Sequence, residues 1–334
     1  MKFLYRADNF ASHHMAPVVL CCVALGILFP DPLSRLNDLA VPLFAFMTFS
    51  NSLSGGFRSM ADVARRPLPV AVIFALLHVV MPLITLGLGS LLFPQDPLFT
   101  TGLVLEYVIP TGVATLMWAG LSRGNLPLCL SVVLLDTLLA PLLVPLSLRV
   151  LLGSVVEMDT WGMIQDLMLM VALPALAGMT LFQVTGGAVA QTLKPRLAPF
   201  GKIALLLVII ANATGCAPFL RDLTPTLVMV MIAAFFLCLL GFFLGYWAGK
   251  LLGFDFPTIQ TIALNSGMRN ISAGAVLALE FFPPEVLFPV AFSPVFLQAS
   301  TAFIVKALRA TRPGRADEAE YRRSLEEQAA QEGA

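Results

Sequence analysis

Charged residues are scarce in this chain. Only 12% of its 334 residues are Asp, Glu, Lys or Arg, and 58% are hydrophobic. A soluble globular domain carries about 25% charged residues, so the composition excludes a soluble enzyme. At about 20 apolar residues per span, a chain of this length has room for roughly ten transmembrane helices. Because 20 basic residues balance 20 acidic ones, no nucleic-acid partner is expected.

Residues that form disulfides or metal sites are also few. The cysteines are scattered through apolar stretches, a spacing that fits neither a disulfide framework nor a metal site, so we expect them in the core. His13 and His14 lack a third ligand at helical spacing and are expected in a solvated tail. No His-Glu-x-x-His, Gly-x-Ser-x-Gly or Cys/His metal pattern occurs. An enzyme is therefore not expected, nor is a cofactor. The five cysteines are Cys21, Cys22, Cys129, Cys216 and Cys238.

Long apolar stretches, in contrast, are abundant, and they predict ten membrane-spanning helices. The spans cover approximately residues 15–30, 38–54, 67–93, 100–121, 126–151, 161–184, 202–220, 225–251, 257–281 and 284–308. The predicted organisation is therefore an N-terminal tail over residues 1–14, a transmembrane transporter domain over 15–308, and a charged tail over 309–334 that lies in water.

Basic residues outside the spans predict the orientation of the chain. Sixteen of them fall on the side that holds both termini, whereas Arg35, Arg149 and Arg221 alone fall on the other side. Cytoplasmic loops carry the excess of Lys and Arg. Both termini are therefore expected in the cytoplasm of a multi-pass protein of the inner or plasma membrane. The remaining basic residue, Arg269, lies inside a span.

Five spans in each half of the chain predict that the second half crosses the membrane in the opposite sense to the first. A weak internal similarity supports this, because FTTGLVLEYVIPTGVATLMWAGL from Phe99 aligns without gaps with FPTIQTIALNSGMRNISAGAVLA from Phe256. Each segment is an apolar helix interrupted by a Pro- or Gly-containing break. Paired interruptions of this kind mark transport sites near the bilayer midplane. The expected inverted repeats cover about residues 15–151 and 161–308.

Ionisable residues inside the spans are candidates for function, because each costs at least about 2.5–3.5 kcal/mol on insertion scales. Arg269 lies near mid-depth in LNSGMRNISAG. Its guanidinium stays protonated, so it needs an anionic neighbour, carbonyl groups, water or a charged substrate. We expect a functional role for Arg269, with a structural ion pair as the alternative. Asp136, in LSVVLLDTLLAPLL, is its expected partner.

Glu106 and His78 are further candidates. Glu106 lies just before the IPTG break and is either a proton site at the crossing point or part of a water-filled approach. His78, in FALLHVVMPL, is expected to be a hydrogen-bonded neutral residue. Glu280, at the end of a span, is expected to reach the membrane interface.

The segments around the two predicted breaks carry the motifs of a known family. IPTGVATLMWAGLSRGNLPLCLSVVLLDTLLAPLLVPL is similar to Pro-Gly-Gly-x-Ala-Ser-Asn, followed by Lys/Arg-Gly-Asn-x-x-Leu-Ser and Thr-Leu-x-x-Pro-Leu-x-x-Pro; NSGMRNISAG is similar to Glu-x-Gly-Met-Gln-Asn-Ser-x-x-Ala. Over approximately residues 16–308 the chain thus resembles the bile acid/sodium symporter family. The resemblance implies an all-α membrane fold with a panel and a core domain, two broken helices crossing at the substrate site, and secondary transport by alternating access.

The resemblance also implies where sodium binds in the family, and here this chain departs from the pattern. Among the corresponding positions, Thr115 keeps a typical hydroxyl ligand. Leu116 and Cys129 stand where Asn and Ser are expected, and Val133 replaces a Thr. His78 is also among these positions, aligned with a Gln. Sodium prefers several oxygen ligands, as hard cations do.

Two further departures change the charge of the site. Asn265 replaces the shared Glu and Arg269 replaces a Gln, which shifts the local charge by two units in the positive direction. Two unit charges about 4 Å apart repel by roughly 4 kcal/mol at an effective dielectric of about 20, so a sodium ion beside Arg269 is disfavoured. We therefore expect Arg269 to take the place of a bound sodium and to face an anionic substrate.

The expected function is sodium-independent transport of an organic anion, as a facilitator, an exchanger or a proton-coupled carrier. Pro110, Gly112, Gly267 and Asn270 in the two breaks complete the expected substrate or coupling site. The alternatives are a sodium symporter with one retained site, to which Asp136 supplies the charge, and a non-transporting ligand-binding or sensor protein. A steroid conjugate and a small carboxylate both fit the expected substrate class, and membrane lipid is the other expected partner.

Overall fold

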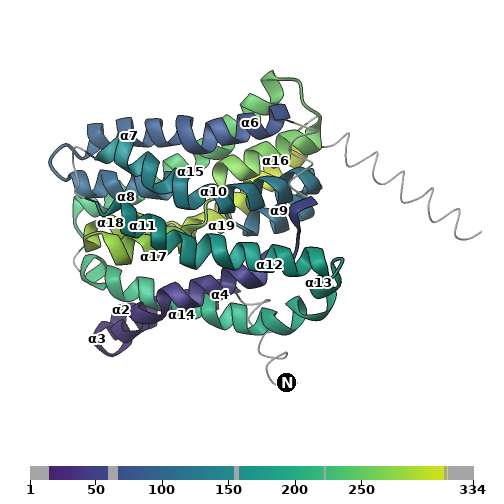
Figure 1. Ribbon diagram of the computed structural model, residues 1–334. Helices are drawn as coiled ribbons and strands as arrows, with labels where there is room; N and C mark the ends of the chain where they lie inside the picture. The colour runs from purple at the N-terminus through teal and green to yellow at the C-terminus, as the bar shows by residue number, and fades with distance from the viewer. Residues whose placement is uncertain (1–14, 59–66, 154–157, 222, 312–313, 315–334) are drawn as a thin grey trace, which may run out of the picture.

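The computed structural model describes residues 15–58, 67–153, 158–221, 223–311 and 314, and every regular element in these ranges is a helix (Figure 1). The elements are α2 (Met15–Leu28), α3 (Pro30–Leu33), η1 (Ser34–Leu39), α4 (Ala40–Ser52), α6 (Pro67–Ala75), η2 (Leu76–Val80), α7 (Met81–Leu92), α8 (Pro97–Val108), α9 (Ala114–Ser122), α10 (Leu126–Leu152), α11 (Thr160–Leu167), η3 (Met168–Ala172), α12 (Leu173–Val184), α13 (Ala188–Thr192), α14 (Lys194–Arg221), α15 (Pro225–Leu251), α16 (Phe256–Gly267), α17 (Ile271–Phe281), α18 (Pro284–Phe292) and α19 (Pro294–Ala310). The predicted N-terminal tail with His13 and His14, and the predicted C-terminal tail apart from residues 309–311 and 314, lie outside the described residues.

Six helical segments are long and apolar enough to cross a membrane, and each has 25–27 residues. At 1.5 Å per residue they are about 40 Å long, which exceeds the roughly 30 Å of a hydrocarbon core. The segments are Pro67–Leu92, Leu126–Leu152, Thr160–Val184, Lys194–Phe219, Pro225–Leu251 and Pro284–Ala310. The prediction of an all-helical membrane protein is confirmed. The other predicted spans occur in the structure as shorter helices or as pairs of short helices.

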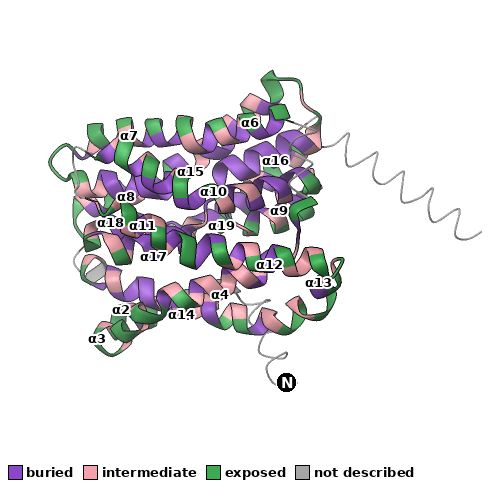
Figure 2. Cartoon of the chain, in the orientation of Figure 1, coloured by how far each residue is buried: buried purple, intermediate pink, exposed green. Residues whose placement is uncertain are grey.

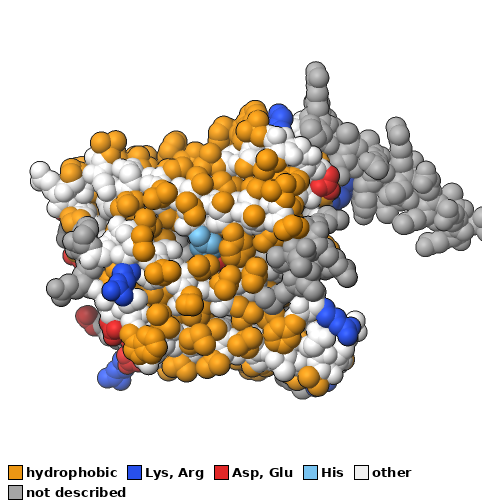
Figure 3. All heavy atoms as spheres, turned by 45° about the horizontal axis from the view of Figure 1, so that its top comes forward, with side chains coloured by type: hydrophobic (Ala, Val, Ile, Leu, Met, Phe, Trp, Pro, Cys, Tyr) orange, Lys and Arg blue, Asp and Glu red, His pale blue; other side chains and the backbone are white. Residues whose placement is uncertain are grey.

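The surface of the helical bundle suits contact with lipid. Figure 3 shows one face on which hydrophobic side chains predominate and Lys, Arg, Asp and Glu lie near the rim. Large apolar side chains are exposed along several long helices, among them Leu83, Leu142 and Phe236. Exposed apolar surface on this scale is what a soluble protein avoids.

Two of the long segments contain a π-helical stretch, and in both cases a proline explains it. η2 ends two residues before Pro82, and η3 ends two residues before Pro174. A proline has no N–H to donate to the carbonyl four residues earlier, so the preceding turn departs from α-helical geometry. π-Helical turns are frequent at functional sites, and η2 contains His78.

The helices are stacked in layers, with α6 and α7 on one side and α2, α4 and α14 on the other (Figure 1). α14 packs against α2 and α4, whereas α16 packs against α15, and α8 packs against α7 and α18. Nine of the twelve residues of α8 and ten of the twelve of α16 are buried (Figure 2). These two helices, which are the first halves of the interrupted segments, therefore lie in the core.

A stripe of glycines on α15 allows α16 to approach closely. A Cβ added to Gly241 would lie 2.7 Å from the backbone oxygen of Ser266, and one added to Gly245 would lie 2.7 Å from the Cα of Ala263. Gly249, one turn further, continues the stripe. Small residues spaced by four are a common way for membrane helices to pack backbone to backbone, where van der Waals contact drives association.

Gly245→Leu is expected to force α15 and α16 apart, because the added side chain meets backbone rather than a flexible side chain. The expected loss of stability is about 1–3 kcal/mol, measured as a lower thermal unfolding midpoint of the purified protein in detergent. Gly87→Leu on α7 is the matched control, since a Cβ there meets nothing within 4 Å, and it is expected to be neutral. Equal losses in the two variants would contradict this account of the packing.

Candidate functional site

The two interrupted helices touch at their breaks. α8 ends at Val108 and α9 begins at Ala114, while α16 ends at Gly267 and α17 begins at Ile271. The backbone N–H of Asn270 donates to the carbonyl oxygen of Pro110 at 2.8 Å, which joins the two breaks directly. A Cβ on Gly112 would lie 2.8 Å from the backbone oxygen of Arg269, so this approach requires a glycine. The sequence-predicted break residues Pro110, Gly112 and Asn270 thus meet in one place.

The place where the two breaks meet is called the crossing. Arg269 is buried there, with 4% of its surface exposed. Its Nη1 donates to the backbone oxygens of Asn265, Ser266 and Met268 at the C-terminal end of α16, at 3.2, 3.0 and 3.2 Å. The last carbonyls of a helix have no partner within the helix and carry negative partial charge. The guanidinium therefore caps α16, and it also lies 5.2 Å from the ring centroid of Tyr107.

The other donors of Arg269 are not used. Nε and Nη2 have no hydrogen-bond partner among the described residues. A buried donor without a partner costs about 1–3 kcal/mol, and more when it is charged. Donors of this kind on a permanent cation are suited to an anionic ligand.

The predicted ion pair between Asp136 and Arg269 is wrong. The carboxylate of Asp136 interacts electrostatically with the guanidinium but does not contact it. α10 instead brings Asp136 to the first break, where its Oδ2 accepts from the N–H of Thr111 at 2.7 Å. Its Oδ1 lies 2.8 Å from Nε2 of His78. Both oxygens are thus engaged, whereas Arg269 turns toward the carbonyls of α16.

His78 reaches Asp136 from the π-helical stretch η2. The expectation of a hydrogen-bonded histidine holds for Nε2, whereas Nδ1 has no partner among the described residues. The side chain of His78 is 9% exposed and that of Asp136 is 0% exposed. The pair therefore links the buried first break to a residue at the edge of the bundle.

Glu106 is a second buried carboxylate, near the end of α8. Its Oε1 accepts a hydrogen bond of 2.5 Å from Oγ of Ser293 at the junction of α18 and α19. Its Oε2 has no partner among the described residues. Glu106 is 3% exposed, so in this structure it does not lie in a water-filled approach. It interacts electrostatically with Arg269.

Thr115, Asn265 and Cys129, three of the positions at which the resemblance implies sodium ligands, lie close to Thr111 or to one another. Oγ1 of Thr111 lies 3.3 Å from Oγ1 of Thr115 and 3.4 Å from Oδ1 of Asn265. Nδ2 of Asn265 donates to Sγ of Cys129 at 3.5 Å. Leu116 and Val133 are part of the surrounding apolar core.

These residues do not fit a sodium ion. They offer few side-chain oxygens and no carboxylate, and Asn265 turns an amide donor toward a sulfur. The carbonyls at the end of α16 are already bonded to a guanidinium. In the described residues there is also no group of three or more His, Cys, Asp or Glu side chains that could hold another metal.

Sequence reasoning missed three members of this cluster, namely Thr111, Tyr107 and Ser293. Thr111 could have been identified from the sequence, because it lies inside the IPTG break. Tyr107 and Ser293 could not, since nothing in their local sequence indicates which buried group they approach. Gly267 lies against the ring of Phe242, which a Cβ would meet at 2.3 Å.

Several other residues lie outside this cluster. Nε1 of Trp118 donates to Oε1 of Gln298 at 2.9 Å, which ties α9 to α19. Met117 is 54% exposed. Glu280 is exposed at the end of α17. Of the five cysteines, Cys21 is exposed, and the others are buried as predicted.

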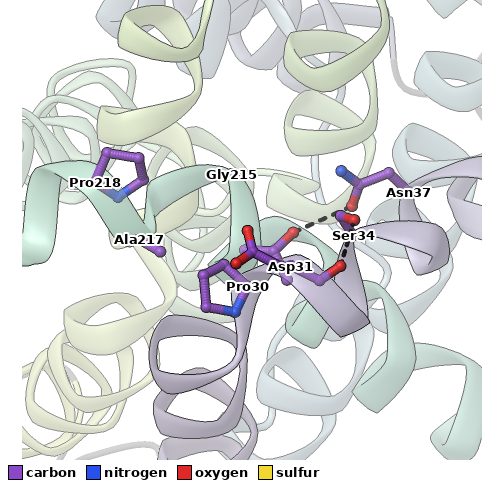
Figure 4. Close-up of a pocket in the computed structure, with 8 residues that line it drawn as sticks. Pro30, Asp31, Ser34, Asn37, Gly215, Ala217 and Pro218 are labelled. Carbon is purple, nitrogen blue, oxygen red and sulfur yellow. Dashed lines mark hydrogen bonds between the residues drawn. The ribbon is translucent and has the colours of Figure 1, made fainter.

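A hollow of about 320 Å³ lies between α3, η1 and α14, and none of the residues of the crossing lines it. Asp31, Ser34 and Asn37 contribute its polar side, with Gly215 and Pro218 opposite (Figure 4). Asp31 is the one ionisable residue in the lining. No residue of the crossing takes part in it, so it is not the candidate site.

Comparison with known proteins gives one family and several relatives. A family model described as the Sodium Bile acid symporter family matches residues 41–220. The chain is 41% identical to the uncharacterized protein YbaS of Bacillus subtilis over 84% of this chain and 92% of that protein. It is 23% identical to the uncharacterized sodium-dependent transporter YocS of the same organism, over 91% and 93%. It is 32% identical to the probable sodium/metabolite cotransporter BASS1, chloroplastic, of Oryza sativa, over 82% of this chain and 66% of that protein.

Ser293→Ala is expected to destabilise the protein, because it removes the hydrogen-bond partner of the buried Glu106 carboxyl group. A buried polar atom left without a partner costs about 1–3 kcal/mol, which lowers the thermal unfolding midpoint in detergent. Ser34→Ala is the control, since its hydroxyl bonds to Asp31 in an exposed position; the expected change is within about 0.5 kcal/mol. A Ser293→Ala protein as stable as Ser34→Ala would rule out this role.

Proposed function

The chain belongs to the sodium bile acid symporter family, and from this premise we propose that it carries an organic anion by alternating access without sodium as the coupling ion. Membership of the family makes it an integral membrane transporter. Membership of the family alone leaves open the substrate class, the coupling ion and the movement during transport.

The observation that carries the proposal is the position of the Arg269 guanidinium. Its Nη1 lies 3.0–3.2 Å from three carbonyl oxygens at the end of α16. In transporters with broken helices, carbonyls and half-helix C-terminal ends of this kind coordinate the coupling ion. Here a covalently attached cation takes that position. A sodium ion about 4 Å from it would be repelled by roughly 4 kcal/mol at an effective dielectric of about 20.

An organic anion is the substrate class that the charges of the crossing favour. Arg269 keeps two nitrogens without a partner among the described residues. α9 and α17 both begin at the crossing, and half-helix N-termini favour anionic substrate groups. A carboxylate or sulfonate on a steroid or on a small acid meets these requirements equally.

The proposed architecture has ten membrane spans. Three of them are each formed by two short helices, namely α8 with α9, α16 with α17 and α18 with α19. α9 and α17 begin at equivalent positions of the internal alignment, Ala114 and Ile271, which supports inverted repeats over about 15–151 and 161–308. We assign α2, α4, α11, α12 and α14 to the panel and the remaining long helices to the core. The transmembrane domain then covers residues 15–308, with the tails 1–14 and 309–334 in the cytoplasm.

A sodium-coupled symporter is the second candidate, favoured by the printed names of YocS and BASS1. It requires Asp136 to replace the charge lost at position 265, but both oxygens of Asp136 already accept hydrogen bonds. A ligand-binding protein without transport is the third candidate. It would bind the anion in detergent and give no flux in vesicles.

Uptake by proteoliposomes decides between these candidates. We expect labelled taurocholate or pantoate to enter at the same rate when all sodium is replaced by potassium, because no mobile sodium is needed at the crossing. Arg269→Gln is expected to lower uptake at least tenfold, whereas Arg149→Gln, at an exposed arginine of α10, leaves it unchanged. Uptake that requires sodium would refute the proposal.

Restoring the family residues is expected to restore sodium binding. In the double variant Asn265→Glu with Arg269→Gln, 100 mM sodium should stabilise the protein against thermal unfolding relative to 100 mM potassium. A dissociation constant of about 10 mM corresponds to roughly 1.4 kcal/mol. The wild type is expected to unfold at the same temperature in both salts. Stabilisation of the wild type by sodium would show that Arg269 does not replace the ion.

A further inference from the structure

The hollow between α3, η1 and α14 lies where helices reach the edge of the bundle. α2 ends at Leu28, just before α3, and the last turns of α14 form the opposite wall (Figure 4). The candidate membrane span on α14, Lys194–Phe219, is about 40 Å long, which exceeds the roughly 30 Å of a hydrocarbon core. Residues 214–218 belong to the end of this span, so the hollow lies at the level of the lipid headgroups. Its volume of about 320 Å³ is that of a small-ligand site.

The wall formed by α3 and η1 presents hydrogen-bond acceptors. The carboxylate of Asp31 is the one ionisable group among the residues that line the hollow. Ser34 donates its hydroxyl hydrogen to the backbone oxygen of Asp31 at 2.8 Å, which leaves its own oxygen as an acceptor. Oδ1 of Asn37 also remains available, because the hydroxyl of Thr214 lies 3.3 Å from it but only 2.7 Å from the backbone oxygen of Ala211.

The wall formed by α14 adds a backbone acceptor. Pro218 lies inside this helix and has no N–H to donate to the carbonyl oxygen of Thr214, four residues earlier. Both residues line the hollow. A carbonyl that lacks its helical donor favours a ligand that brings one. The two walls together therefore suit a cationic group with several N–H donors, which a primary ammonium group supplies.

The charges next to the hollow favour a ligand that carries both signs. Arg35 and Asp38 are exposed on η1, directly after the residues of the first wall. With Asp31 they amount to two carboxylates and one guanidinium, which is a net charge of −1 for α3 and η1. A ligand with net negative charge is therefore disfavoured, whereas a phosphate linked to an ammonium group finds a partner for each charge.

Exposed apolar side chains accompany this polar site. Leu25 and Leu28 lie in the last turn of α2, Phe29 follows them, and Leu39 ends η1. All four are more than two fifths exposed. Apolar side chains beside a polar hollow, at the depth where headgroups meet acyl chains, match the two parts of a phospholipid.

We propose that this hollow binds the headgroup of a phospholipid with a primary ammonium group, as in phosphatidylethanolamine. The ammonium donates to the carboxylate of Asp31 and to the neighbouring acceptors of Ser34 and Thr214. The phosphate lies beside Arg35, and the acyl chains follow the exposed side chains of α2. Phosphatidylcholine has the same charges but no N–H to donate, and phosphatidylglycerol has no cation.

A headgroup in this position stabilises the contact between α14 and the second interrupted segment. Gly215 lines the hollow. A Cβ added to it would lie 2.5 Å from Cδ2 of Leu287 on α18 and 3.1 Å from Cδ2 of Leu279 on α17. The bound lipid thus contacts α14 where this helix packs against α17 and α18. Because it binds the folded protein, it should raise the unfolding temperature.

The test uses the full chain purified in dodecyl maltoside. The probes are dioctanoyl phosphatidylethanolamine, phosphatidylcholine and phosphatidylglycerol at equal concentrations, and soluble phosphoethanolamine as the headgroup alone. Binding is measured by native mass spectrometry and by the shift of the thermal unfolding midpoint. The wild type is expected to bind phosphatidylethanolamine at least about tenfold more tightly than phosphatidylglycerol, because charge-assisted hydrogen bonds are the strong ones, and more tightly than phosphatidylcholine.

Asp31→Asn keeps the shape of the side chain and removes its charge, and it is expected to weaken binding of phosphatidylethanolamine at least about tenfold. Asp38→Asn is the matched control, because it makes the same change of charge at an exposed position outside the lining; binding is expected to stay within about twofold. Ser34→Trp, which fills the hollow from an exposed position, is the second variant and is expected to abolish the shift of the midpoint.

Three results would overturn the proposal. The first is equal stabilisation of the wild type by all three lipids, which would indicate general contact with lipid or detergent. The second is unchanged binding of phosphatidylethanolamine by both Asp31→Asn and Ser34→Trp. The third is equal stabilisation by phosphoethanolamine alone, which would assign the hollow to a free amine instead of a lipid.

Discussion

The structure depends on how the ends of the broken helices are neutralised inside an apolar bundle. A helix that stops in the core exposes carbonyl groups at one end and N–H groups at the other, and water is not there to bond to them. At the end of α16 the guanidinium of Arg269 bonds to three carbonyl oxygens. At the first break the carboxylate of Asp136 bonds to the N–H of Thr111. Each break therefore carries a charged side chain of the sign that its backbone requires.

Close backbone packing holds these charges in register. Gly112 lets the first break lie against Arg269, and the glycines of α15 let α16 pack against it without intervening side chains. Backbone contacts of this kind leave little freedom to shift one break relative to the other. The distance between Arg269 and the carboxylates of Asp136 and Glu106 is thus set by helix packing, and the charges interact without meeting in an ion pair.

Much of the fold could be predicted from the sequence, because long apolar stretches identify membrane helices without knowledge of their partners. The apolar stretches 67–93, 126–151 and 225–251 agree with the helical segments Pro67–Leu92, Leu126–Leu152 and Pro225–Leu251 to within one residue. Both breaks were placed correctly by Pro110 and Gly267. The partner of Asp136 was predicted wrongly. A helix of known sequence still has an unknown rotation, and the π-helical turn at η2 moves His78 into a position that α-helical spacing does not give.

By itself, the sequence determined that this protein is an all-helical membrane transporter of a known family, since hydropathy, breaks and motifs are local properties of the chain. Only the tertiary structure decided where the charges go. Arg269 donates to carbonyl oxygens of α16 because that helix ends at the crossing. Asp136 bonds to His78 and Thr111 because α10 packs beside the first break. Which buried charges meet depends on the relative rotation and depth of helices far apart in sequence, and that is fixed by packing rather than by local composition.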